Sequence, residues 1–203
     1  MKHSLLLVAV LALVAFAAPV HAQYMFIDTN NDNVCTSGDV LTPSSTSISL
    51  WVNTNHNADG SSATCNTADG ALTIGSYEFF LRSSGGSVTY GTWTDNLGFG
   101  SVFGTFTGGT DAYIGRGGSS LLAAGLYKLG SMAISGVSAG TTIAIVSGSS
   151  LYPAGFTSFG TNCSGSTGTG TYILPDDWTN VCGTASGTPI TQTTWGQIKN
   201  LYK

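Results

Sequence analysis

Residues 47–53 read SISLWVN, so the apolar side chains Ile48, Leu50 and Val52 fall on every second position. A period of two sends alternate side chains to opposite faces of an extended chain, which is typical of a β-strand with one buried face. Residues 77–82 alternate in the same way. These stretches predict that the chain is built from strands.

Further runs of this kind occur at residues 88–93, 101–106, 127–134 and 141–146. Gly- and Ser-rich breaks such as residues 83–86 and 115–118 lie between them and are typical of turns. Seven or more short strands without an internal helix pattern predict an all-β fold, a jelly-roll β-sandwich of about nine strands.

The same pattern predicts one β-bulge and the position of three large aromatic side chains. The apolar phase of residues 127–134 shifts at Gly130, and a glycine at such a shift indicates a β-bulge. The large aromatic side chains of Phe79, Phe103 and Phe106 are expected to fill the core of the sandwich.

Charge is scarce in this chain. Charged residues make up 8% of the 203 residues, glycine contributes 28, and the formal net charge is −4. A protein that binds nucleic acid by neutralising phosphates needs a basic face, so this balance excludes that class of partner. A surface rich in Ser, Thr, Asn and Gly is instead typical of secreted β-proteins.

Residues 1–22 have the layout of a secretory signal. Lys2 precedes an apolar run at residues 5–18, and the small residue Ala22 ends the segment. The run is shorter than the roughly 20 residues that a membrane-spanning helix needs. We therefore expect cleavage after Ala22 and an exported protein, secreted or at the cell surface, with no transmembrane segment in the mature chain.

The rest of the chain is expected to form one domain at residues 23–184, a linker at residues 185–194 and a tail at residues 195–203. Trp195, Ile198 and Leu201 follow at three-residue steps, which predicts one face of a short amphipathic helix. A helix this short is marginal alone. The tail is therefore expected to need a partner, which is the sandwich itself, a surface or secretion component, or another subunit.

The four cysteines form an even set in an exported chain, which predicts disulfides. Three pairings are possible. The sequential one, Cys35 with Cys65 and Cys163 with Cys182, closes short loops at the least entropic cost. A zinc site is excluded because no C-x-x-C pair occurs and His56 is the only histidine after the signal.

Residues 28–39 space their oxygen-bearing side chains in the manner of a calcium loop. Calcium takes six to eight oxygen ligands, and a staggered spacing lets one loop wrap the ion. The expected ligands are Asp28, Asn30, Asp32, Thr36 and Asp39, with the backbone carbonyl of Val34. The loop resembles those of EF-hands, and more closely those of dockerins, in which Asp stands at the last position. Asn33 replaces their usual glycine, and asparagine tolerates the left-handed conformation that this position needs.

A second oxygen-rich cluster uses alternate positions, Asn53, Asn55, Asn57 and Asp59. One interpretation is an ordinary turn that closes a hairpin. The other is that both clusters share calcium, drawn together by the Cys35–Cys65 bridge. His56 is expected to be exposed within this cluster.

No catalytic residue is predicted, and the chain is not expected to be an enzyme. Hydrolysis by paired carboxylates needs two acids that face one bond. A Ser-His-acid site would depend on His56 alone, without the G-x-S-x-G elbow.

Aromatic side chains are the other candidates for ligand binding, because they stack on sugar rings if a sheet face presents them to solvent. The candidates are Trp51, Tyr90, Trp93 and Trp178. Trp51 points away from the apolar face of its predicted strand and is the best exposed of them. The competing interpretation is that these rings fill the core.

Residues 47–150 resemble a cohesin domain, within the broader carbohydrate-binding-module type of sandwich. The resemblance rests on ISLWVNT at residues 48–54, LTIGSYEFFL at residues 72–81, LYKLGSMAI at residues 126–134 and AGTTIAI at residues 139–145. It implies a nine-stranded jelly roll that binds a protein partner or a polysaccharide without catalysis. The sequence thus predicts a secreted, calcium-stabilised binding module; the alternative is a structural or self-assembling cell-surface protein.

Overall fold

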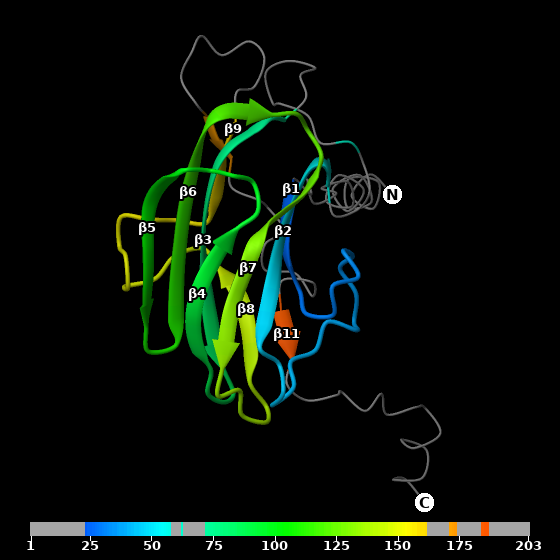
Figure 1. Cartoon of the computed structure of the whole chain (residues 1–203), viewed down its shortest axis with the longest axis vertical. Helices are drawn as coiled ribbons and strands as arrows, with labels where there is room; N and C mark the ends of the chain where they lie inside the picture. Colours follow the sequence, from blue (N-terminus) through cyan, green and yellow to red (C-terminus); the bar gives the residue numbers. More distant parts are fainter. Residues whose placement is uncertain (1–22, 58–61, 63–71, 162–170, 174–183, 187–203) are drawn as a thin grey trace, which may run out of the picture.

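The computed structural model describes residues 23–57, 62, 72–161, 171–173 and 184–186. These residues form two antiparallel sheets (Figure 1), which confirms the all-β sandwich. The described part contains no helix long and apolar enough to cross a membrane. The predicted signal at residues 1–22 and the predicted tail at residues 195–203 lie outside the described residues.

The first sheet has the order β1-β2-β7-β4. Its strands are β1 (Gln23–Asp28), β2 (Ser47–Asn57), β7 (Leu126–Ser135) and β4 (Thr89–Asp95). Leu50 of β2 lies opposite Gly130 of β7, whereas Trp51 lies opposite Lys128, so Leu129 is an extra residue in β7. This register shift confirms the β-bulge predicted at Gly130.

The second sheet is built around strand β3, which pairs with β6, β8 and β9. It contains β3 (Ile74–Ser84), β5 (Ser101–Gly108), β6 (Asp111–Leu122), β8 (Thr142–Val146), β9 (Ser158–Thr161), β10 (Thr171–Ile173) and β11 (Thr184–Ser186). One edge of β3 pairs with β6, which pairs with β5. The other edge pairs first with β9 and then with β8. β11 pairs with β8 and includes the first residues of the segment expected to be a linker.

The core lies between the two sheets and is lined by alternate residues of their facing sides. Ile48, Leu50 and Val52 of the first sheet are at most 1% exposed, as their alternation predicted. From the second sheet, Phe79 and Leu81 are fully buried. The prediction that Phe79 belongs to the core is confirmed.

Three polar groups inside the sandwich satisfy one another. The Trp93 indole N–H donates to the Tyr77 hydroxyl at 3.0 Å, and that hydroxyl donates to the Asp95 carboxylate at 2.5 Å. Burial, followed by the hydrogen bond to Asp95, raises the pKa of Tyr77 above its usual range. Buried hydroxyl and indole groups need such partners. The two hydrogen bonds therefore fix the Trp93 ring within the core.

The connection from β8 to β9, residues 147–157, runs outside the second sheet near β5 and β6 (Figure 1, yellow). Thr157 fills the gap where β8 and β9 meet β3. Its hydroxyl accepts from the Phe80 backbone N–H at 3.1 Å and donates to the Val146 carbonyl at 2.5 Å. One end of the connection is thereby fixed to the central strand.

Candidate binding site

The loop after β1 is organised by its own carboxylates. Asp28 accepts hydrogen bonds from the backbone N–H groups of Asn30 at 3.1 Å, Asn31 at 2.6 Å and Asn33 at 3.2 Å. Asn31 and Asn33 have φ angles of 60° and 65°. Asn33 therefore adopts the left-handed conformation expected of it in place of glycine.

Asp39 closes this loop from its other end. It is 4% exposed and accepts from the backbone N–H of Thr29 at 2.8 Å and of Thr36 at 3.0 Å. Burial raises the pKa of Asp39, the charges of Asp28 and Asp32 act in the same direction, and the two N–H groups oppose them. The like charges leave an excess of negative charge in the loop, which a bound divalent cation would offset.

The carboxylates of this loop point mainly at donors within the loop itself. Asp32 accepts from the Val34 backbone N–H at 3.0 Å and from the Asn30 amide at 2.9 Å. Within the described part of the chain, no group of three or more His, Cys, Asp or Glu side chains is placed to hold a metal. Calcium at the predicted ligands Asp28 to Asp39 therefore stays a prediction.

The second oxygen-rich cluster lies at the far end of the β1–β2 ladder from that loop. Asp28 pairs with Ser49, whereas Tyr24 pairs with Asn53. Four residues along a strand span about 13 Å at 3.3 Å per residue. The structure therefore corrects the idea that Asn53 shares calcium with Asp28.

The side chain of Asn53 has a local role instead. Its carbonyl oxygen accepts from the backbone N–H groups of Asn55 and His56, both at 2.9 Å, in the manner of an Asx turn. His56 is exposed, as predicted. Asn57 pairs with Gln23, and Asp59 lies outside the described residues.

Of the four cysteines, only Cys35 falls within the described residues, and it is disulfide-bonded. Cys65, Cys163 and Cys182 lie outside them. The pairing of Cys35 with Cys65 and of Cys163 with Cys182 therefore stays a prediction.

The aromatic candidates from the sequence are mostly not at the surface. Tyr90 and Trp93 are 7% and 6% exposed and pack in the core, so the condition that a sheet face presents them to solvent is not met. Trp51 is half-buried and stacks on Phe26, with ring centroids 6.2 Å apart and planes 8° apart. Trp178 lies outside the described residues.

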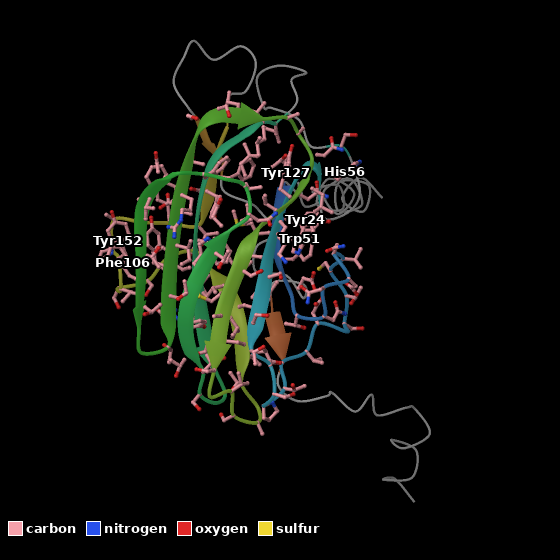
Figure 2. All side chains as sticks on the ribbon, in the orientation of Figure 1. Tyr24, Trp51, His56, Phe106, Tyr127 and Tyr152 are labelled. Carbon is pink, nitrogen blue, oxygen red and sulfur yellow. The ribbon has the colours of Figure 1, made fainter. Side chains whose placement is uncertain are left out.

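A hollow of about 290 Å³ opens instead on the outer face of the second sheet. Its lining consists of Ser76, Tyr77, Glu78, Phe103, Tyr113, Tyr152, Ala154, Phe156 and Ser158. These residues come from β3, β5, β6, β9 and the 147–157 connection. Figure 2 labels Phe106 and Tyr152 beside β5, across the molecule from Trp51.

Aromatic rings form much of the hollow and its rim. Phe106 stacks on Tyr152 with centroids 5.2 Å apart and on Tyr113 at 5.8 Å. Phe103, Phe156 and Phe106 are 51%, 39% and 41% exposed. The expectation that Phe103 and Phe106 fill the core is wrong, because β5 is the outermost strand of the wider sheet and only Gly104 within it is buried.

Glycines beneath these rings make the hollow possible. A Cβ added at Gly117 would lie 2.5 Å from the Phe103 ring, and one at Gly115 would lie 2.8 Å from the Tyr113 hydroxyl. The β5–β6 register shifts between Val102 and Gly104, which places the extra residue at Phe103.

The glycine-rich segment at residues 115–118 is not the turn that its composition suggested. It is part of strand β6, which runs from Asp111 to Leu122.

Glu78 is the acidic group of this hollow. One of its oxygens accepts from the Tyr113 hydroxyl at 2.7 Å, and the other accepts from the Ser158 hydroxyl at 3.2 Å. Both donors are neutral. Glu78 is half-buried, so its carboxylate is held in a fixed orientation and still faces the hollow.

The 147–157 connection is fixed at its first end as well as at Thr157. The Ser149 hydroxyl donates to Asp111, and the Leu151 backbone N–H donates to the Ser149 hydroxyl at 3.1 Å. Arg82 binds Asp111 through two N–H groups at 2.9 and 2.7 Å and lowers the pKa of that carboxyl to about 2. The segment that carries Tyr152 and Phe156 is thereby positioned in advance, which reduces the entropy lost on binding a ligand.

The described lining residues of this site are aromatic rings, hydroxyl groups and one carboxylate. Glu78 is the single carboxylate among the described lining residues. Asp111, on the same face, is already paired with Arg82. Aromatic faces, one carboxylate and the hydroxyls of Ser76, Tyr152 and Ser158 are the usual components of a small-molecule pocket.

No protein-family model, curated protein or solved structure matches this chain. The site therefore has to be interpreted from its own geometry and chemistry.

Proposed function

We propose that the chain is an exported, non-catalytic carbohydrate-binding module of the jelly-roll type, and that its ligand lies in the hollow over Glu78. One observation carries this proposal. The exposed rings of Phe103 and Phe156 and the half-buried ring of Tyr152 surround a fixed carboxylate on one sheet face. Sugars present apolar C–H faces that pack on such rings and hydroxyl groups that donate to a carboxylate.

The size of the hollow favours a glycan over a protein partner. Its volume of about 290 Å³ is near the lower limit for small-molecule pockets. A stable protein interface covers about 800 Å² on each partner. A short stretch of a polysaccharide chain is the kind of ligand that a pocket of this size can hold.

Glycan binding is tested by screening the full chain on a glycan array and titrating the ligands found by calorimetry. Tyr152→Ala and Phe156→Ala are each expected to weaken binding about tenfold, the ratio that 1.4 kcal/mol of binding energy produces. Trp51→Leu is the matched control, because Trp51 lies on the first sheet and should leave the affinity unchanged. Loss of binding in Trp51→Leu alone would move the site to the first sheet, and a chain that binds no glycan would contradict the proposal.

The second candidate function is self-assembly, and strand β5 supports it. This strand has no charged residue, is exposed at every position except Gly104, and pairs along one edge only within the described residues. Unpaired uncharged edges promote strand addition. However, the bulge at Phe103 disrupts regular pairing at an edge, so we prefer ligand binding. Concentration-dependent oligomers in sedimentation, together with no glycan bound, would favour assembly.

We also propose that calcium binds at Asp28–Asp39 and stabilises the module. Calcium at ten times its dissociation constant should add about 1.4 kcal/mol of stability and raise the melting temperature, because it binds only the folded loop. Asp28→Ala combined with Asp32→Ala should abolish this rise. Since Asp28 also accepts three backbone N–H groups, the calcium-induced shift of each variant is compared and not its absolute melting temperature. An equal shift in the double variant would eliminate this assignment.

A further inference from the structure

We propose that the hollow over Glu78 selects glycans that carry a free ammonium group, as N-deacetylated amino sugars do. This inference rests on the proposed carbohydrate-binding function and names the ligand class of the same site. It starts from the position of one carboxylate among aromatic rings.

The charge of Glu78 has no described counter-ion. The one ion pair formed by described residues is Arg82 with Asp111. Arg116, the cation of the neighbouring strand, is buried and donates to the backbone carbonyls of Gly104 at 3.2 Å and Gly115 at 2.8 Å. Two neutral hydroxyls therefore orient the Glu78 carboxylate without neutralising it.

The remaining hydrogen-bonding capacity of this carboxylate faces the hollow. An ionised carboxylate offers about four lone-pair sites, and the bonds from Tyr113 and Ser158 occupy two of them. An ammonium group is a pure donor that can fill the others. A charge-assisted bond of this kind is roughly twice as strong as one between neutral groups.

The surrounding rings add to the attraction. Phe103, Tyr113, Tyr152 and Phe156 line the same hollow. Aromatic faces carry partial negative charge and attract cations within about 6 Å of the ring centre, most strongly where water is partly excluded. A neutral hydroxyl or acetamido group gains neither the ionic bond nor the cation–π attraction, so the hollow should discriminate between an amino sugar and its N-acetylated form.

The test compares oligomers of glucosamine and of N-acetylglucosamine of equal length, titrated into the full chain at a slightly acidic pH that protonates the sugar amine. The glucosamine oligomer is expected to bind about tenfold more tightly. Glu78→Gln should remove this preference and still bind the N-acetylated oligomer. Glu78→Met, uncharged and similar in length, is the second variant if the first does not fold.

The control is Thr92→Lys, an exposed position on β4 of the other sheet. It shifts the net charge by the same amount as Glu78→Gln and should keep the tenfold preference. Equal affinity for the two oligomers, or a preference that survives Glu78→Gln, would overturn the inference. If neutral glycans bind through Tyr152 in that case, the carbohydrate-binding function stands, whereas a chain that binds no glycan of any kind refutes both proposals.

Discussion

Replacing Phe79 by alanine is expected to lower the free energy of unfolding by about 3–5 kcal/mol. Phe79 is fully buried on the central strand β3. Its ring centroid lies 6.0 Å from that of Tyr77 and 5.2 Å from that of Trp93. Because a domain of this size is stable by only about 5–15 kcal/mol, this variant should unfold at a much lower urea concentration than the parent chain.

Phe103→Ala is the matched control for this measurement, since it removes the same side chain from the outer face. Phe103 is 51% exposed, and substitutions at such positions usually change stability by about 0.5 kcal/mol or less. Similar urea midpoints for the two variants would contradict the assignment of Phe79 to the core and of Phe103 to the hollow.

The core of the first sheet could be predicted from local alternation. Ile48, Leu50 and Val52 are buried because a two-residue period has only one way to place its apolar face inward. The bulge at Gly130 was predictable for the same reason, since a change of apolar phase within a strand requires an extra residue.

The candidate site could not be predicted in this way, because it depends on which faces are covered. The pattern of β5 shows Phe103 and Phe106 as apolar residues, but it does not show that β5 lies at the edge of the wider sheet. Phe156 and Tyr152 lie in a connection without periodicity, whose ends are held near β3 and β6 by the contacts of Thr157 and Ser149. Glu78 lies between the apolar residues Tyr77 and Phe79 in an alternating stretch, but its donors Tyr113 and Ser158 are 35 and 80 residues away in sequence.

In the expected calcium loop, the turns depend on nearby residues, whereas contact with the second oxygen-rich cluster depends on how the strands pair. Its turns are local, because Asp28 binds donors two to five residues ahead and Asn33 adopts a left-handed conformation. Whether Asn53 reaches the same loop depends on the register of β1 against β2. No spacing along the sequence specifies that register, so the shared-calcium idea could be assessed only with the sheet in place.

Replacing Gly130 by alanine is expected to lower the free energy of unfolding by about 3 kcal/mol, the upper end of the usual range for overpacked sites. A Cβ at this position would overlap both the Thr94 carbonyl oxygen and the Trp93 indole ring. The indole cannot move aside easily, because it donates to the Tyr77 hydroxyl and contacts the Phe79 ring.

The control for this substitution is Gly100→Ala, since an added Cβ at Gly100 meets nothing within 4 Å. There alanine should leave the chain as stable as before or stabilise it by about 0.4–1 kcal/mol, by reducing the conformational entropy of the unfolded chain. Both variants are measured by urea denaturation under the same conditions. If Gly130→Ala proved as stable as Gly100→Ala, β7 would not approach β4 as closely as the bulge requires, and the fixed position of Trp93 in the core would be wrong.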